Sequence, residues 1–372
     1  MKPMPLPKLL TAFCFCLSIV FGSAQQTNTS AETLSLLFIG DVMGHGPQIK
    51  SAWVDSTESY DYNGVFAPLK RVLQNRDFAI ANLEVTLAGP PFDGYPQFSS
   101  PDALAEGLRN NGVDVLVTAN NHSCDRRLNG VIRTIEVLDS SNILHTGTFL
   151  NQEHRDSTNL LILKKGSFRI GLLNYTYGTN GLPTPAPTIV NRIDTALIAS
   201  DIAMSKSDSL DKLIVFIHWG KEYQLHPSDE QINLGQFLFD KGVDIVIGSH
   251  PHVIQRMELH RDTVNFKDKF IAYSLGNFVS NQRDTYRDGG AMVEISLTKN
   301  GTTTTIDNAG YLLTWVHRPT INNKVFYEVL PCSLIEQKAF QDIQEAEKMK
   351  LYMELAREHF DAENIGVPEI SY

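Results

Sequence analysis

Short apolar runs alternate with amphipathic segments along most of the chain. Buried strands are predicted at residues 34–39, 78–84, 113–118, 213–217 and 243–247, with further apolar strands at 170–173 and 270–273. Apolar residues at helical spacing predict helices at residues 65–76, 128–140 and 232–241. Strands that alternate with helices in this way favour an α/β fold.

One unit of helix, glycine, strand and polar loop occurs twice, in "NGVDVLVTANNH" and in "KGVDIVIGSHPH". Gly112 and Gly242 are each predicted to end a helix in the left-handed conformation that glycine adopts freely. Pro101, after Ser100, is predicted to begin the helix that Gly112 ends. The repetition indicates two uses of one local structure rather than a duplicated domain.

The pattern changes after Gly289. Residues 291–297, 311–316 and 325–330 alternate like strands without helices between them, and residues 337–360 form a mixed-charge segment. We expect one domain over residues 34–300, to which residues 301–372 add strands and an exposed C-terminal helix.

The amino end has the pattern of a secretory signal. Lysines precede an apolar run over residues 9–22, and small residues at 22–24 form a cleavage site. The run is shorter than the ~20 residues of a spanning helix, so cleavage is favoured over an uncleaved anchor. The sequence therefore predicts a signal peptide over residues 1–24, a polar linker over residues 25–33, and export to the periplasm or cell surface.

Composition and charge limit the kinds of partner that we expect for this chain. Hydrophobic residues make up 42% of the 372 residues and charged residues 20%, which is typical of a packed globular body. The formal net charge is −10 and no Lys/Arg cluster is present, so nucleic acid is not expected as a partner. Any anionic substrate would need a local cationic group. No second long apolar run follows the signal, so no spanning helix is expected in the mature chain.

The cysteines do not form a disulfide scaffold. Phe13 and Phe15 precede Cys14 and Cys16, where a lipoprotein signal requires a small residue. After cleavage only two cysteines remain, Cys124 and Cys332, and the sequence leaves open whether they pair.

Side chains of metal-ligating types follow five of the predicted strands. They lie at or just beyond the carboxyl ends: Asp41, Glu84, Asn121 with His122, His218, and His250 with His252. In an open α/β sheet the carboxyl ends of the strands meet at one crevice. We therefore expect these separated segments to converge on one edge of the sheet.

The expected ligand set combines carboxylate, carboxamide and imidazole. Such sets suit Mn, Fe or Zn, and the absence of thiolate distinguishes them from a structural zinc site. A carboxylate that bridges two ions, with imidazoles on both sides, is what a two-metal centre needs. His122 is then placed to protonate a leaving group, and Asp125 to orient that imidazole.

Each of these residues also has a purely structural interpretation. A Gly-Asp pair after a strand is usually a turn, Asn121 can satisfy backbone groups, and His218 can lie in the core beside Trp219. The pair His250 and His252 is the stronger signal, because two imidazoles one residue apart can reach adjacent ligand positions. The shared position after strands favours a metal site.

Weaker candidates surround this set. Glu222 is either a partner for an imidazole N–H or a surface residue, and Ser274 and Asn277 follow another strand and are expected to line the pocket. His45 lies in the loop after Asp41, but nothing else about its context indicates a site.

Together the motifs resemble the CapA family of capsule and poly-γ-glutamate synthesis proteins. The matching stretches are "FIGDVM", "ANLEVTL", "TANNHSCD", "FIHWGKEY", "VIGSHPHVIQ" and "YSLGNFV". That family is similar in fold to the calcineurin-like metallophosphoesterases, so the resemblance implies a four-layer αββα sandwich. Residues after 300 carry no recognisable motif.

The resemblance also implies roles. Asp41 and His252 correspond to ligands of a first ion and Glu84 to the bridging carboxylate; Asn121, His218 and His250 correspond to ligands of a second ion, and His122 to the general acid. Two positions depart from typical phosphoesterases. Met43 stands where they have a histidine, as in CapA proteins generally, and Glu84 replaces a bridging aspartate. One of the two ions is thereby put in doubt.

The leading hypothesis is an exported CapA-like, metal-dependent hydrolase that acts on a phosphoester or an amide in capsule or poly-γ-glutamate synthesis, anchoring or remodelling, alone or with other capsule-assembly proteins. Two alternatives stay open. One is a non-catalytic binding protein for an acidic envelope polymer, and the other a general extracytoplasmic phosphoesterase. The polymer, the number of ions and the oligomeric state are left open.

Overall fold

The computed structural model describes residues 31–265, 267–337, 339–340 and 342–370, together with residues 1 and 3–5. Most of the expected signal peptide, including its two cysteines, thus lies outside the described residues, and the architecture below is that of the unit Ala31–Tyr372. In the described part no helix has both the length and the apolar character needed to cross a membrane. Cys124 and Cys332 are buried and free.

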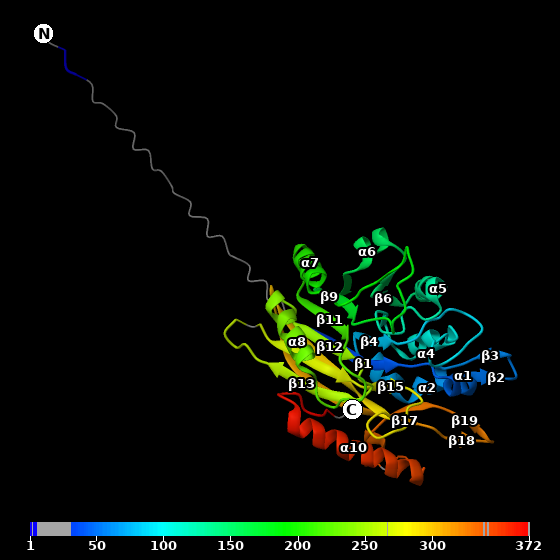
Figure 1. Cartoon of the computed structure of the whole chain (residues 1–372). Helices are drawn as coiled ribbons and strands as arrows, with labels where there is room; N and C mark the ends of the chain where they lie inside the picture. Colours follow the sequence, from blue (N-terminus) through cyan, green and yellow to red (C-terminus); the bar gives the residue numbers. More distant parts are fainter. Residues whose placement is uncertain (2, 6–30, 266, 338, 341, 371–372) are drawn as a thin grey trace. The chain divides into compact units, whose positions relative to one another are not determined.

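Two large sheets make up the centre of this unit (Figure 1). The first has eight strands. Its order is β20-β17-β16-β1-β4-β5-β6, with β15 paired to β1. The strands are β1 (Glu32–Val42), β4 (Phe78–Leu83), β5 (Val115–Val117), β6 (Leu144–Thr146), β15 (Asn277–Val279), β16 (Gly289–Asn300), β17 (Thr303–His317) and β20 (Glu328–Pro331). β1, β4, β5 and β6 run parallel, whereas β16 pairs with β1 antiparallel. The expected strands after Gly289 thus extend this sheet.

The second sheet has six strands in the order β13-β14-β12-β11-β9-β8. The strands are β8 (Leu161–Lys165), β9 (Phe168–Thr176), β11 (Lys212–His218), β12 (Ile245–Ser249), β13 (Ile254–His260) and β14 (Lys269–Leu275). The four inner strands are parallel, and the two edge strands are antiparallel to their neighbours.

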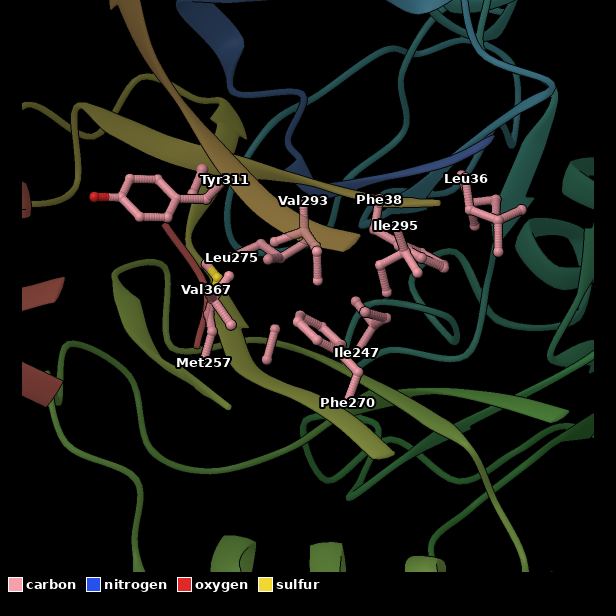
Figure 2. Packing of buried hydrophobic residues seen from close by; sticks show 14 of the residues in the cluster. Leu36, Phe38, Ile247, Met257, Phe270, Leu275, Val293, Ile295, Tyr311 and Val367 are labelled. Atoms are coloured by element: carbon pink, nitrogen blue, oxygen red, sulfur yellow. The ribbon is translucent and has the colours of Figure 1, made fainter. Parts of the chain in front are cut away.

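The two sheets pack face to face over one apolar core. Because side chains alternate across a strand, Leu36 and Phe38 of β1 face the second sheet while Leu37 and Ile39 face the helices. Figure 2 shows side chains from both sheets meeting in this core, among them Val293, Ile295, Ile247, Met257 and Phe270.

Helices cover the outer face of each sheet. Apolar residues of α2 (Asn63–Phe66), α3 (Lys70–Gln74), α4 (Ala103–Asn111) and α5 (Arg127–Ser140) pack on the first sheet, and those of α7 (Thr195–Ser205) and α8 (Asp229–Lys241) on the second. The expected four-layer αββα sandwich is confirmed. The remaining elements are short: α1 (Gly46–Ala52), α6 (Gln152–Thr158), α9 (Ser333–Glu336), η1 (Ala67–Leu69), η2 (Lys206–Asp208), β2 (Trp53–Val54), β3 (Ser59–Tyr60), β7 (Thr148–Phe149), β10 (Ile189–Val190), β18 (Thr320–Ile321) and β19 (Lys324–Val325).

Local predictions hold for the glycine caps and fail at several boundaries. Gly112 and Gly242 end α4 and α8 with φ of 111° and 109°. The expected helix at residues 65–76 is instead α2, η1 and α3, because Pro68 in η1 cannot donate a backbone hydrogen bond. β1 begins at Glu32, within the expected linker, and helix α4 begins at Ala103, after Pro101.

The C-terminal helix α10 (Ile343–Glu363) is not the exposed helix that its charges suggested. Its face of Met349, Tyr352, Met353, Ala356 and Phe360 joins the core between the sheets. Beyond the helix, Ile365 O accepts from Leu259 N of β13 and Pro368 O accepts from Tyr311 N of β17. This segment therefore links an edge strand of the second sheet to a strand of the first.

Candidate metal centre

The six expected ligands lie together, at the carboxyl ends of strands from both sheets. Asp41, Glu84 and Asn121 come from the first sheet, and His218, His250 and His252 from the second. The expectation that one edge of a single sheet supplies all of them is therefore wrong. The sandwich places two sheet edges side by side, and each supplies half of the set. All six side chains are buried.

The ligand atoms form two overlapping groups. Glu84, His218 and His250 make one, and Asp41, Glu84 and His252 make the other; within each group the atoms lie within 4.8 Å of one another. Glu84 Oε1 lies 3.6 Å from His218 Nε2 and 3.7 Å from His252 Nε2. Glu84 thus occupies the bridging position between the groups.

Asn121 belongs to the His218 side of the cluster. Its Oδ1 lies 3.1 Å from His218 Nε2, the nitrogen that faces Glu84. The other ring nitrogen of His218 lies 2.9 Å from Ser249 Oγ. A hydroxyl there fixes the ring orientation, as partners of metal-binding histidines commonly do.

Asn82 is one of the residues at this centre that sequence reasoning missed. Its Nδ2 donates to Asp41 Oδ1 at 2.8 Å and to Glu84 Oε2 at 3.2 Å, so one amide holds both carboxylates. Asn120 Nδ2 in turn donates to Asn82 Oδ1 at 3.3 Å. The available signal was an amide within the otherwise apolar strand β4, because a buried polar group requires partners.

The backbone is specialised where the ligands are attached. The pairing of β1 with β4 shifts register between Ile39 and Asp41, and a Cβ on Gly40 would lie 2.1 Å from Gly276 O. Only glycine fits this close approach. His250 and His252 adopt φ of 100° and 58°, a left-handed conformation that costs non-glycine residues energy and is concentrated at functional sites.

Without a cation the cluster is electrostatically incomplete. Burial, and next the adjacent Asp41, raise the pKa of Glu84 well above its ordinary value. Glu84 Oε1 and His250 Nδ1 have no hydrogen-bond partner among the described residues. Burial lowers the pKa of His250 to about 3 and that of His218 well below its usual range, so both rings are neutral, as metal ligation requires. The donors and the orphaned oxygen therefore fit a divalent cation.

His122 and Asp125 form a buried pair beside the cluster. His122 Nδ1 lies 2.8 Å from Asp125 Oδ2, which also accepts a hydrogen bond from Phe98 N at 2.7 Å. The edge-on Phe98 ring, 4.6 Å from His122 between centroids, further fixes the imidazole. The geometry suits the expected role of Asp125 in orienting His122, with Nε2 left facing Asn180 at 3.5 Å.

Tyr177 was also missed. It follows β9, and its ring centroid lies 4.6 Å from that of His250 while its backbone N donates to His218 O at 2.9 Å. The side chain is 43% exposed, so it reaches from the cluster to the surface. Burial, and then Glu84, raise the pKa of Tyr177 to about 12, which keeps its hydroxyl a donor.

The weaker sequence candidates have mixed outcomes. Glu222 is exposed, and no hydrogen bond joins it to an imidazole in the part of the chain that the structure describes. Asn277 does not line the cluster as a ligand but donates from Nδ2 to His252 O at 3.3 Å, while Ser274 Oγ donates to Val253 O at 2.7 Å. Met43 is 2% exposed and packs in the apolar cluster between the first sheet and its helices.

His45 lies nearer the site than its sequence context suggested. Its Nδ1 accepts from Asn281 N at 3.2 Å, and its ring meets Phe98 edge-on at 5.4 Å. Burial, opposed by Gln48, lowers the pKa of His45 to about 4. His45 thus supports the Phe98 ring that fixes His122.

Fold and cluster together define an αββα protein with a buried carboxylate–imidazole centre. The family model described as "Bacterial capsule synthesis protein PGA_cap" matches residues 35–282, and the chain belongs to this family. The resemblance to CapA proteins is thereby confirmed.

Two curated relatives are similar along most of the chain. The "Capsule biosynthesis protein CapA" of Bacillus anthracis is 27% identical over 282 residues, covering 73% of this chain and 66% of the relative. The "PGA biosynthesis protein CapA" of Bacillus subtilis (strain 168) is 29% identical over 283 residues, covering 73% of this chain and 70% of the relative. The match thus leaves about a third of each relative unaligned.

Solved structures with a related arrangement include NAD nucleotidase (NadN) of Haemophilus influenzae. It has a TM-score of 0.48 and 12% identity, over 92% of this chain and 65% of that one. The calcineurin-like phosphoesterase YfkN of Bacillus subtilis has a TM-score of 0.44 and 12% identity, over 76% and 91% of the two chains.

Proposed function

We propose that this protein is an exported, metal-dependent hydrolase that acts in capsule or poly-γ-glutamate synthesis, anchoring or remodelling. Family membership and the names of the two CapA relatives support the biological setting. The apolar run and small-residue site within residues 1–24 support export. Export is tested by the intact mass of protein recovered outside the cytoplasm, which should lack residues 1–24; a full-length mass would contradict cleavage.

The observation that carries the catalytic part of the proposal is the position of Glu84. Its carboxylate is fully buried, lies between the Asp41–His252 and His218–His250 groups, and has an oxygen without a hydrogen-bond partner in the described chain. Burying two neighbouring carboxylates without a counter-charge is costly. Divalent cations held by the six ligands would supply that charge.

The surrounding residues are arranged for hydrolysis. When bound, divalent cations lower the pKa of water and stabilise charge that develops on a scissile phosphoryl or carbonyl group. His122, held at Nδ1 by Asp125, can deliver a proton from Nε2 to the leaving oxygen or nitrogen. Tyr177 reaches from the ligand rings to the surface, where it can contact a bound substrate. The same arrangement would serve a phosphoester or an amide.

The test combines metal content with activity. Wild type and His250→Ala, each loaded with Mn, are assayed on phosphodiester and γ-glutamyl substrates while bound metal is measured by elemental analysis. We expect His250→Ala to lose metal and to lose activity by at least about a hundredfold. Equal activity in the two proteins would reject metal catalysis at this centre.

His122→Ala is the matched control. It removes an imidazole that lies in neither ligand group. Activity should fall by about 10²–10⁴-fold with metal content unchanged, because only proton transfer is lost. Loss of metal from this variant would instead make His122 part of the ligand set.

A non-catalytic function as a binding protein for an acidic envelope polymer is the second candidate. The observation that favours it is Met43, which buries a thioether in the core where phosphoesterases place a histidine. A protein with full metal content, tight polymer binding and no turnover would support this alternative. Metal-dependent turnover would exclude it.

A further inference from the structure

One cationic side chain of this acidic protein, Arg287, lies near the candidate metal centre. The chain carries a formal net charge of −10, so an anionic substrate approaches against the overall field. Arg287 stacks on Tyr223 with its guanidinium carbon 3.7 Å from the ring centroid. The Tyr223 ring in turn lies 6.2 Å from the His252 ring. Arg287 thus stacks on Tyr223, whose ring lies, tilted, next to the His252 ring of the ligand cluster.

This stack is tied to the loop that carries the ligands. Asn277 Nδ2 donates to Arg287 O at 2.8 Å and to His252 O at 3.3 Å, so one amide joins the two backbones. On the opposite side Tyr223 N donates to Pro251 O at 2.8 Å. Both members of the cation–π pair are therefore fixed to the segment between His250 and His252.

The guanidinium retains donors for a ligand. It forms an ion pair with Asp284, at 2.8 Å, and that carboxylate is 73% exposed. An exposed pair of this kind contributes little and is readily exchanged. Arg has five N–H donors, and stacking on Tyr223 leaves those in the guanidinium plane available to a carboxylate or phosphate. The Tyr223 ring is itself 38% exposed, so the stack is open to solvent.

We propose that Arg287 is a specificity-determining residue that binds a negative group of the substrate adjacent to the bond acted on at the metal centre. The inference rests on the proposed hydrolase function and adds the selection of anionic over neutral substrates. Tyr223 is the positioning residue, because the guanidinium stacks on its ring and that ring lies next to His252. The recognised chemistry is a carboxylate or phosphate group, which Arg binds through two parallel hydrogen bonds.

The test compares two forms of one γ-glutamyl substrate. The form with a free carboxylate next to the scissile bond is compared with its methyl ester, for wild type and Arg287→Gln loaded with Mn. We expect Arg287→Gln to lower kcat/KM for the carboxylate about ten- to a hundredfold, mainly through KM, and to leave the ester within about twofold. Arg287→Lys should restore part of the loss, since it keeps the charge without the planar fork.

Arg109→Gln is the matched control. Arg109 is an exposed arginine of α4, on the outer face of the first sheet, and its loss changes the net charge equally. Arg109→Gln should leave kcat/KM unchanged for both substrate forms. Metal content is measured for every protein and should not change. An equal loss on both forms in Arg287→Gln, or no loss on either, would overturn the assignment.

A direct binding measurement separates this inference from the proposed function. If metal-loaded wild type turns over neither form and no phosphodiester, the hydrolase proposal fails, and calorimetric titration with a γ-linked glutamate oligomer then decides the role of Arg287. Weaker binding by Arg287→Gln than by wild type and Arg109→Gln supports it. Equal affinities in the three proteins, or no binding by any, reject it.

Discussion

The two ligand groups that share Glu84 differ in composition. Asp41, Glu84 and His252 supply two carboxylates and one imidazole, whereas Glu84, His218 and His250 supply one carboxylate and two imidazoles. Carboxylate-rich sites suit Mg or Mn, and imidazole suits Zn, Fe and related metals. One shared residue therefore couples two sites that we expect to prefer different ions.

The two ligand groups also differ in the further donor atoms that lie near them. Asn121 Oδ1 lies 3.1 Å from His218 Nε2, where it would supply a fourth donor to the imidazole-rich group. On the other side, Met43 packs into the apolar cluster and supplies none. The backbone N of His250 and Nδ1 of His252 approach Asp41 Oδ2 at 3.3 and 3.0 Å. The Asp41 group thus has fewer donors and a stronger negative charge.

Glu84→Gln should have the largest effect, because it acts on both groups at once. We expect it to lose both ions and to reduce activity to background, as measured by elemental analysis and turnover. A variant that keeps one ion would show that the groups bind independently and that Glu84 does not bridge them.

In the metal-free protein, by contrast, Glu84→Gln should raise the stability of the fold, and this gain should depend on pH. The pKa of Glu84 is raised in the fold, so above its ordinary value of 4.5 the folded state binds more protons than the unfolded state. Its contribution to stability therefore falls as pH rises. The Tm of chelator-treated Glu84→Gln should exceed that of wild type by a margin that grows as the pH rises above 4.5. A margin independent of pH would contradict the raised pKa of Glu84.

Asp41→Asn and Asn121→Ala should each affect one of the two ligand groups, so we expect effects smaller than that of Glu84→Gln. Each variant is expected to fold and to lose one ion, Asp41→Asn from the carboxylate-rich group and Asn121→Ala from the imidazole-rich group. Metal stoichiometry and competition between Mn and Zn measure the difference. If Asn121→Ala fails to fold, by circular dichroism, Asn121 is structural and the contrast between the groups is lost.

Tyr177→Phe should give the smallest effect. Its ring would remain against His250, and only the hydroxyl is removed, so metal content should not change and kcat should fall about two- to tenfold. Tyr223→Phe is the counterpart on the His252 side and keeps the ring on which Arg287 stacks. Equal effects of the two variants would indicate that substrate contacts both sides alike.

Much of the fold follows from local pattern. Strand cores, glycine caps and the position of ligand types after strands could be read from residues near in sequence, since burial imposes a period of two and turns require glycine. The helix α10 was misjudged because its apolar face of Met349, Met353 and Phe360 is interleaved with charges. Only the surrounding sheets show that this face is covered.

At the site, residue types were predictable and their neighbours were not. Asp41 and His252 meet through packing of two sheets, which no local pattern specifies. Asn82 gave a signal, as an amide inside an apolar strand, but its bonds to two carboxylates depend on the register between β1 and β4. Tyr177 gave none, because its orientation depends on tertiary packing.

The antiparallel pairing of β1 with β16 has a practical consequence for fragment design. The family match ends at residue 282, yet β16 (Gly289–Asn300) forms hydrogen bonds along the strand that bears Asp41. A fragment cut at the end of the match would leave β1 with an unpaired edge and an uncovered apolar face, both of which promote aggregation. The shortest self-sufficient version of this protein must therefore include segments that carry no family motif.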